Sequence, residues 1–399
     1  MAGTDQARPR GRQLGRVIPG LLAAVLLVDL ALRLAFAFRF VPIDPLTFRP
    51  SDALLAYRPV GATFEPNRHY YNARSYGDVA GIGNLREPRE YRPVRFTTDA
   101  LGYRNAAHAL DAEIGAILVG DSFAAGVGAS DDKTLSSRLS ALGPCVVYNA
   151  ASEARDVVPD RILAAARRLT VRNRLVIRVY AEDAEIPPPR ETLLRKLAAQ
   201  MPEESRGITG RLRGILTVSP LQILSERALR ALDDDRILPN GYATNAVKAT
   251  VSNGDSMAFW TPEVQNFTRR RPVALAYWRW LRDELRKARF DLRVVLVPSK
   301  YTVYRPFLVD QAPDGREAGG YLDRLERALR AAGIPVLNLT PLLSAEAARQ
   351  LKHERYLYWP DDVHWNARGI ALAAAAIQET WPLPEASCGP PHVQARKGP

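Results

Sequence analysis

The chain has 399 residues, of which 47% are hydrophobic and 25% charged, enough for one large globular domain with appendages. Its formal charge of +12 fits nucleic acid, an anionic membrane surface or an acidic polymer as a partner. The two cysteines and five histidines form no CxxC or Cys/His cluster, which argues against a structural zinc site. We therefore expect neither a metal ion nor a cofactor.

The first segment is a candidate membrane span preceded by positive charge. Residues 17–41 form an apolar stretch long enough to cross a bilayer. Four arginines precede it: Arg8, Arg10, Arg12 and Arg16. This asymmetry predicts a cytoplasmic basic tail at 1–16, an inner-membrane anchor at 17–41 and a periplasmic location for the bulk of the chain.

Two features of this segment keep an alternative open. Asp29 and Arg33 lie inside it, four residues apart on one helix face, where each is costly in a membrane but the two can pair. Ala35-Phe36-Ala37 has the form of a signal-peptidase site, so cleavage after Ala37 is the alternative to an uncleaved anchor. In both cases the domain is exported, and we do not expect nucleic acid as its partner.

A stalk and an α/β domain follow. Residues 42–110 are rich in Pro, Arg and Tyr without a sustained period, which predicts an extended stalk packing on the domain. The expected strands are 116–119, 145–149, 175–180, 292–297 and 336–339, and the expected helices are 134–142, 161–169, 274–288, 321–332 and 367–380. Apolar strands between amphipathic helices predict a doubly wound, flavodoxin-like parallel sheet covered on both faces. The domain is expected at 111–383, with a carboxyl-terminal tail at 384–399.

The alternation of strands and helices is interrupted at 185–267, which we predict to be an insertion. It begins with three prolines and ends in a polar segment, 242–259, that has the character of a hairpin. Doubly wound units need only short connections, so a segment of this length is expected to act as a lid or partner surface. Four apolar residues among arginines are expected to face the core or to rest on the membrane: Leu194, Leu197, Ile215 and Leu216.

Two short motifs at opposite ends of the domain carry the chemistry. Gly120-Asp121-Ser122 directly follows the first strand, at the carboxyl edge where open α/β sheets place their ligand sites. Asp361-Asp362-Val363-His364 supplies a histidine with carboxylates close enough to orient it. We predict Ser122 as nucleophile, His364 as base and Asp361 as the residue that orients Nδ1, with Asp362 as the alternative. This constellation is suited to acyl transfer.

These residues resemble the SGNH (GDSL) hydrolase family, whose first block is Gly-Asp-Ser and whose last block is Asp-x-x-His. The resemblance covers about residues 117–378. A second Gly-Asp-Ser at 254–256 has no apolar strand before it and is expected to form a turn. Residues 95–104 resemble a segment that precedes the first block in membrane-anchored family members. Residues 297–304 resemble a stretch of family members linked to alginate and other exopolysaccharide O-acetylation.

The resemblance implies an oxyanion hole built from three hydrogen-bond donors. The first is the backbone N–H of Ser122, and the second maps to the N–H of Ala154. The third maps to Glu182, where the family has an asparagine. A glutamate donates only when protonated, so Glu182 either weakens the site, donates through a raised pKa or lies outside it. The predicted substrate-binding residues are Asp121, Lys300, Tyr301 and Tyr304.

The resemblance thus implies a membrane-anchored, extracytoplasmic serine esterase or O-acetyltransferase acting on a polysaccharide or other glycan. The two activities differ in whether water or a sugar hydroxyl resolves the acyl-serine. The expected partners are the glycan or acyl-ester substrate, the inner membrane and a membrane acyl-donor protein. Glu182 and Ala154 favour the alternative, a catalytically weak or inactive scaffold or carbohydrate-binding subunit of an exopolysaccharide assembly complex. In an oxidising compartment Cys145 and Cys388 are able to pair.

Overall fold

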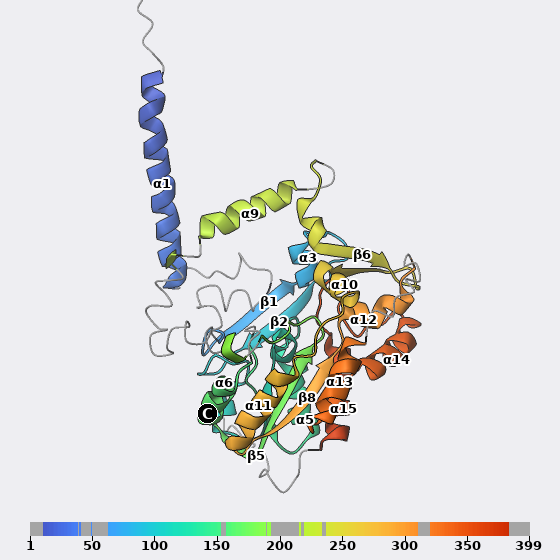
Figure 1. Cartoon of the computed structure of the whole chain (residues 1–399). Coiled ribbons are helices and arrows are strands. Elements are labelled where there is room, and N and C mark those ends of the chain that lie inside the picture. Colours follow the sequence, from blue (N-terminus) through green and yellow to red (C-terminus); the bar gives the residue numbers. More distant parts are fainter. Residues whose placement is uncertain are drawn as a thin grey trace, which may run out of the picture.

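A five-stranded sheet forms the centre of the structure, with the strand order β4-β3-β5-β8-β9 (Figure 1). The strands are β3 (Glu113–Val119), β4 (Val146–Asn149), β5 (Thr170–Ala181), β8 (Asp291–Val297) and β9 (Val336–Asn338). Every pairing is parallel, and the chain winds outward from β3 in both directions, as in doubly wound folds. The predicted flavodoxin-like sheet and its five strands are confirmed.

The computed structural model describes residues 11–38, 40, 49, 63–152, 157–188, 190–192, 215–216, 219–233, 237–309 and 320–382. Ala154, Leu194, Leu197, Cys388 and the predicted tail at 384–399 lie outside the described residues, so the predictions that concern them stay predictions. Cys145, just before β4, is disulfide-bonded.

Helices cover both faces of the sheet, because its strands are apolar on both sides. One face packs on α5 (Leu135–Leu142), α14 (Thr340–Leu351) and α15 (Ala367–Thr380), the other on α6 (Pro159–Ala166), α11 (Leu275–Lys287) and α13 (Tyr321–Ala331). On β3, Leu118 is buried against the first group and Ile117 against the second. This alternation is what a parallel sheet buried on both faces requires. Helix α14 was not predicted.

The segment before the sheet is folded where an extended stalk was expected. Strands β1 (His69–Ser75) and β2 (Arg92–Thr97) pair antiparallel, and helix α3 (Asp78–Ile82) lies between them in sequence. Phe64 and Phe96 of this segment are buried in the same core cluster as β3. Pairing of the two strands satisfies the hydrogen-bonding groups of their backbones. The Arg- and Pro-rich sequence of this segment does not predict such pairing.

The insertion contains helix α9 (Pro220–Leu232), a hairpin of β6 (Ala246–Thr250) and β7 (Ser256–Trp260), and helix α10 (Thr261–Phe267). The hairpin was expected from the sequence and is confirmed. Its turn is the second Gly-Asp-Ser, where Gly254 has a φ of +92°, a conformation that favours glycine. This copy of the motif is therefore structural, as predicted.

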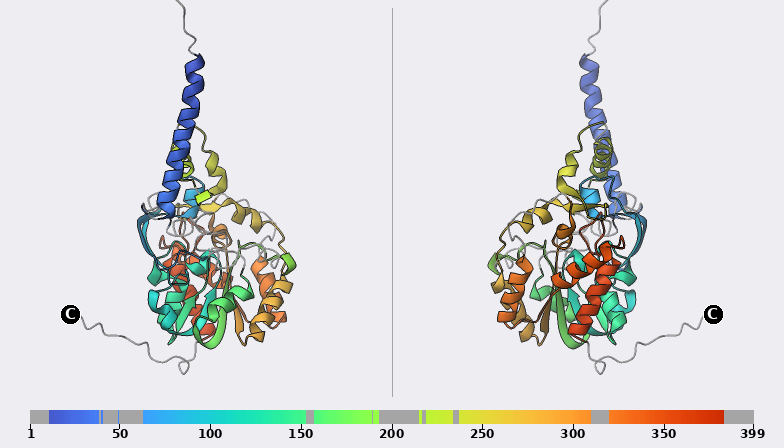
Figure 2. Two further views of the ribbon diagram at one scale, coloured as in Figure 1. Left: turned by 90° about the vertical axis from the view of Figure 1, so that its left-hand side faces the viewer. Right: turned by 90° about the vertical axis from the view of Figure 1, so that its right-hand side faces the viewer.

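Helix α1 (Gly11–Ala37) projects away from the domain in all views (Figures 1 and 2). Its segment Val17–Phe36 has a mean hydropathy of 2.2 and is only 6% buried, so it is long and apolar enough to cross a membrane. A helix of this kind near an amino terminus serves as a membrane span or as a signal sequence, the two alternatives the sequence leaves open.

Candidate active site

Ser122 begins a four-residue helix, α4 (Ser122–Ala125), at the turn that follows β3. The side chain of Asp121 caps this helix by accepting the N–H of Phe123 at 3.0 Å. Gly120 makes the turn possible, because a Cβ there would lie 2.4 Å from the Cβ of Ala124. The turn thus places Ser122 at the carboxyl edge of the sheet.

His364 lies within hydrogen-bonding distance of Ser122, although 242 positions separate them in the chain. Its Nε2 is 2.8 Å from Oγ of Ser122, and its Nδ1 is 2.6 Å from Oδ1 of Asp362. The ring of Phe123 packs against the imidazole, with centroids 4.9 Å apart. Asp362 keeps the proton on Nδ1, which leaves Nε2 able to accept the proton of Ser122.

Asp361 does not orient His364, contrary to the first sequence-based assignment. Its Oδ2 accepts the N–H groups of Gly77 at 2.8 Å and Glu90 at 2.9 Å, and its Oδ1 accepts Arg92. Adjacent side chains in this loop point to different sides, so one carboxylate serves the amino-terminal segment and the next serves the histidine. The alternative orienter, Asp362, is the one that the geometry supports.

Arg92 of β2 binds both carboxylates. Its Nη1 lies 2.9 Å from Asp361 and its Nη2 lies 2.9 Å from Asp362, and all three side chains are buried. Its guanidinium also lies over the ring of Trp359, at 4.1 Å from the centroid. Two adjacent buried carboxylates repel each other unless a cation neutralises them, so Arg92 is what makes this arrangement stable. No local pattern predicts this role of Arg92, because the contact joins segments far apart in the chain.

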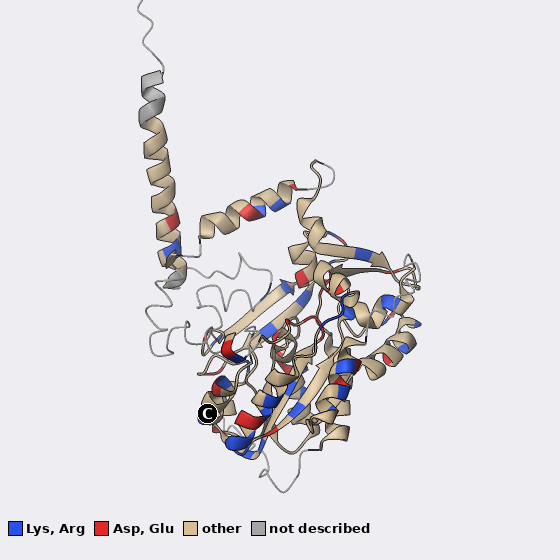
Figure 3. Cartoon of the chain, in the orientation of Figure 1, with Lys and Arg blue, Asp and Glu red and all other residues tan. Residues whose placement is uncertain are grey.

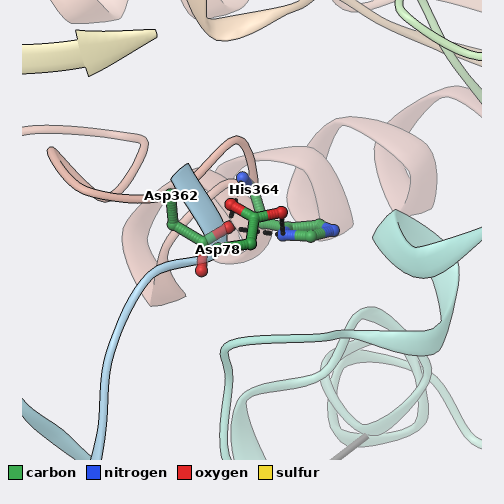
Figure 4. Close-up of side chains that lie close together, drawn as sticks. All are labelled: Asp78, Asp362 and His364. Carbon is green, nitrogen blue, oxygen red and sulfur yellow. Dashed lines mark hydrogen bonds and ion pairs between the residues drawn. The ribbon is translucent and has the colours of Figure 1, made fainter. Parts of the chain in front are cut away.

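Asp78, the first residue of α3, is a third carboxylate at the site and was also not predicted. Its Oδ1 accepts the N–H of Val363 at 2.9 Å, and its Oδ2 lies 3.7 Å from Nδ1 of His364. Asp78 and Asp362 are hydrogen-bonded to each other, and both carboxylates lie on the Nδ1 side of the imidazole (Figure 4). One of the two must therefore carry a proton.

The charges around the pair decide where that proton resides. Burial and the neighbouring Asp362 raise the pKa of Asp78 to about 7. Burial also acts to raise the pKa of Asp362, but His364 and Arg92 hold that pKa well below its usual range. Below a pH of about 7, Asp78 is therefore the partner that carries the proton, and Asp362 stays ionised. Burial lowers the pKa of His364, but the two carboxylates outweigh burial and raise it to about 9.

We expect esterase activity of this site to rise with pH through the ionisation of His364. The imidazole accepts the proton of Ser122 only when neutral, and its raised pKa keeps it largely protonated below a pH of about 9. Measured as kcat/KM for p-nitrophenyl acetate, the acid limb should lie well above the ordinary histidine value of about 6.5. An acid limb at or below that value would show that the carboxylates do not stabilise the imidazolium.

The three side chains also have the geometry of a metal site. Nδ1 of His364 and one oxygen each of Asp78 and Asp362 lie within 4.8 Å of one another in buried positions. In the structure the guanidinium of Arg92 supplies the positive charge at Asp362, and Oδ1 of Asp78 accepts a hydrogen bond from the N–H of Val363. Because hydrogen bonds already engage these atoms, we assign the group to the orientation of the histidine.

A cavity of about 200 Å³ opens beside the serine and the histidine. It is lined by Arg49, Asp78, Val79, Ile82, Asp121, Ser122, Phe123, Asp183, Ala184, Trp260, Val363 and His364. The lining combines three carboxylates, one arginine and an indole ring with small apolar surfaces. Such a mixture suits a small acyl group bonded to a polar, hydroxyl-bearing molecule.

Glu182 lies away from this cavity, contrary to its predicted place in the oxyanion hole. Its carboxylate accepts the N–H of Ser299 at 3.0 Å and lines a separate small cavity with Thr302 and Arg271. The next residue, Asp183, borders both cavities. Glu182 and Asp183 lie in the turn that follows β5, where neighbouring side chains take different directions, so a shift of one position moves the carboxylate into the site.

Lys300 is fully buried and does not reach the cavity, contrary to its predicted role in substrate binding. Its Nζ donates to the backbone oxygens of Asp362 at 2.6 Å, Trp359 at 3.2 Å and Pro360 at 3.3 Å, and also to that of Ala258. Lys300 therefore fixes the loop that carries the catalytic histidine to the insertion hairpin.

The two tyrosines predicted to bind substrate are core residues. Tyr301 packs edge-on against the rings of Phe259 and Phe267, with centroids 5.4 and 5.3 Å away. Tyr304 is fully buried, and its hydroxyl accepts the N–H of Leu357 at 2.8 Å. Of the four predicted substrate contacts, the cavity beside the nucleophile includes Asp121 alone.

Residues 95–104, which resemble a segment of membrane-anchored SGNH proteins, hold the loop that follows α4. The buried guanidinium of Arg104 donates to the backbone oxygens of Ala129 at 2.6 Å and Arg95 at 2.8 Å, and also to that of Gly126. It lies over the ring of Phe96 at 4.0 Å. This segment therefore positions the nucleophile helix from its carboxyl end.

Comparison with protein families supports the resemblance. Residues 263–392 match the family described as the SGNH hydrolase-like domain of the acetyltransferase AlgX. The matched segment contains Asp362 and His364, whereas Ser122 precedes it. Neither the curated proteins nor the solved structures include a match to the chain.

Proposed function

We propose that the chain, which carries an SGNH hydrolase-like domain of the AlgX acetyltransferase type, is an acyl-ester hydrolase or O-acetyltransferase with Ser122 as its nucleophile. The supporting observation is the hydrogen-bonded series at the site. Oγ of Ser122 lies 2.8 Å from Nε2 of His364, whose Nδ1 lies 2.6 Å from Asp362. A histidine held in this tautomer, once neutral, can take the proton of the serine hydroxyl and make the serine a nucleophile.

The proposed reaction has two acyl transfers. Oγ of Ser122 attacks the acyl carbonyl while its proton moves to Nε2 of His364, and the same proton then passes to the departing alkoxide. In the second half, His364 takes a proton from water or from a sugar hydroxyl, whose oxygen attacks the acyl-serine. The bond to Ser122 breaks and the proton returns to its Oγ.

Negative charge develops on the carbonyl oxygen in both transfers. The backbone N–H of Ser122 is an available donor, because it lies in the first turn of α4, where helix geometry provides no intrahelical acceptor. Asp183 also faces the cavity. Burial and the nearby Asp121 raise the pKa of Asp183 to about 6, so at neutral pH it is mostly ionised and opposes the oxyanion.

Replacing Asp183 with asparagine is therefore expected to increase turnover of a small acetyl ester about tenfold or more at neutral pH. The amide both removes the opposing charge and offers an N–H donor. Below a pH of about 6 the native carboxyl is protonated, so the variant and the wild type should converge there. Glu182→Gln is the matched control, because its carboxylate hydrogen-bonds Ser299 away from the cavity. A fall in activity of Asp183→Asn would instead indicate a substrate ligand.

We propose a glycan as the substrate and a location outside the inner membrane. The indole of Trp260 and the carboxylates of Asp121 and Asp183 support a sugar, since aromatic faces and carboxylates bind its C–H faces and hydroxyl groups. The apolar helix α1 supports anchoring by an uncleaved span, with the domain periplasmic. A transferase in this position would receive its acyl group from a membrane acyl-donor protein.

The experiment offers the purified full chain an acetyl ester with and without a glycan acceptor. Release of alcohol without acceptor indicates a hydrolase, whereas release that depends on the acceptor and yields an O-acetylated glycan indicates a transferase. A serine-directed fluorophosphonate should abolish either activity. Binding of glycan without turnover under both conditions, and without labelling, would contradict the proposal.

The second candidate is a non-catalytic scaffold or carbohydrate-binding subunit of a polysaccharide assembly complex. The observation that favours it is the acidic lining of the cavity, because Asp183 lacks the donor that an asparagine would supply. A non-catalytic role does not explain why Ser122, His364 and Asp362 are hydrogen-bonded in series. We therefore place it second.

A further inference from the structure

The apolar helix α1 carries a charged pair in its second half, visible as single red and blue bands in Figure 3. Nε of Arg33 lies 2.5 Å from Oδ2 of Asp29. The remaining polar atoms of the pair bind the insertion. Ser219, the N-cap of α9, donates to Oδ1 of Asp29 at 2.6 Å. Arg33 donates to the backbone oxygens of Ile215 at 2.7 Å and Leu216 at 3.0 Å.

These contacts attach the amino-terminal end of α9 to α1. Figure 1 shows α9 beginning near the second half of α1 and running away from it at a steep angle. Charged residues in a candidate membrane span are costly unless they find partners. The insertion supplies those partners here, so the Asp29–Arg33 pair joins α1 to the insertion.

The two sides of α9 differ in character. Arg230 faces the domain, where it donates to the backbone oxygen of Gly81 at 2.6 Å and lies over the ring of Tyr242 at 4.1 Å. The opposite side carries residues at the three- and four-residue spacing of one helix face: Leu221, Leu224, Ala228 and Leu232. Leu224 and Leu232 are 43% and 54% exposed in the part of the chain that the structure describes.

We propose that α9 is an interfacial helix that lies in the outer leaflet of the bilayer crossed by α1, with its leucine face in lipid and Arg230 toward the domain. The proposal rests on the proposed anchoring of the chain by α1. A helix with one apolar and one polar side, joined at its first residues to a membrane-spanning helix, is suited to lie in the plane of the membrane. Leu216, whose backbone oxygen accepts Arg33, adds a further apolar side chain, 79% exposed, near the junction of α9 and α1.

This arrangement also places the active-site cavity next to the membrane. The backbone oxygen of Arg230 accepts a hydrogen bond from Nδ2 of Asn84 at 2.8 Å, and Asn84 lies two residues after the end of α3. Asp78 and Ile82, at the two ends of α3, line the cavity. The segment of α3 that lines the cavity is therefore hydrogen-bonded, through Asn84, to the helix that we place at the lipid surface.

The test measures contact of α9 with lipid in the full chain, reconstituted into nanodiscs of phosphatidylethanolamine and phosphatidylglycerol. Ala228→Cys is labelled with an environment-sensitive fluorophore under non-reducing conditions, which spare the disulfide-bonded Cys145, and the unsubstituted chain provides the labelling blank. Quenching by spin-labelled lipid is recorded. Leu22→Cys on α1 reports the anchor, and Leu142→Cys, an exposed position on α5, is the matched control outside the membrane.

The proposal predicts strong quenching at positions 22 and 228 and several-fold weaker quenching at 142. If the label at position 22 is quenched, and the label at position 228 is quenched no more than the label at position 142, the proposal for α9 is wrong and the anchor still stands. Absence of quenching at 22 would overturn the anchor itself, and this proposal with it. A blue-shifted but unquenched label at 228 would show that protein, such as a second copy of the chain, covers α9, which also overturns it.

Discussion

Replacing Ser122 with alanine is expected to lower kcat for acetyl-ester hydrolysis by about 10⁴- to 10⁶-fold. Oγ of Ser122 is the atom within 2.8 Å of Nε2 of His364, so the variant loses the nucleophile while the base and Asp362 remain. Removal of one hydroxyl at the surface of a cavity should leave the fold intact, which circular dichroism and thermal unfolding will check. The measurement is turnover of p-nitrophenyl acetate together with labelling by a fluorophosphonate.

Ser256→Ala is the matched control for this experiment. Ser256 belongs to the second Gly-Asp-Ser, but it begins strand β7 and is exposed beyond the hairpin turn. This variant should keep full activity and labelling. Equal labelling of Ser122→Ala and the wild type, or loss of labelling only in Ser256→Ala, would contradict the assignment.

Replacing Asp362 with asparagine should lower kcat about 10⁴-fold, the effect expected when the orienting carboxylate of a serine triad is lost. The amide no longer holds the proton on Nδ1 of His364, which now lies 2.6 Å from the carboxylate. The same change removes a charge that raises the pKa of His364, so the acid limb of the pH profile should move down.

Asp361→Asn is the comparison that makes this prediction specific. Its carboxylate contacts Arg92 and two backbone N–H groups of the amino-terminal segment rather than the histidine. Its loss should lower stability by about 3–5 kcal/mol, the usual effect of breaking a buried ion pair, without moving the acid limb. If Asp361→Asn shifts the limb and Asp362→Asn does not, the sequence-based assignment is right and the geometric one is wrong.

The fold could be predicted from the sequence because it depends on local apolar patterns. The five strands are short apolar runs, and the helices between them, such as residues 274–288 and 321–332, have clear amphipathic periods. Strands β1 and β2 were missed, since they gain their conformation from pairing with each other and packing on the domain. Long-range pairing of this kind leaves little local signal.

The site could be predicted only as far as its two motifs. Ser122 and His364 were expected together, and the structure brings them together. The errors at Asp361 and Glu182 have one cause: each is next to the residue that faces the site, and sequence does not fix which side of a loop or strand end a side chain takes. Arg92 and Asp78 were missed, because both reach the histidine loop from a segment far away in sequence.

Direct detection of the acyl-enzyme is the most direct test of the central claim, that Ser122 accepts the acyl group. The full chain is mixed with excess p-nitrophenyl acetate, quenched in acid within the first turnovers and digested for mass spectrometry. We predict a single acetyl group on the peptide that contains Ser122 and no acetyl group on this peptide in Ser122→Ala. In the wild type, the acetyl group should disappear when a glycan acceptor is added or when the reaction is left to run to completion. An acetyl group on another residue, or alcohol release by the wild type with Ser122 never modified, would contradict the account.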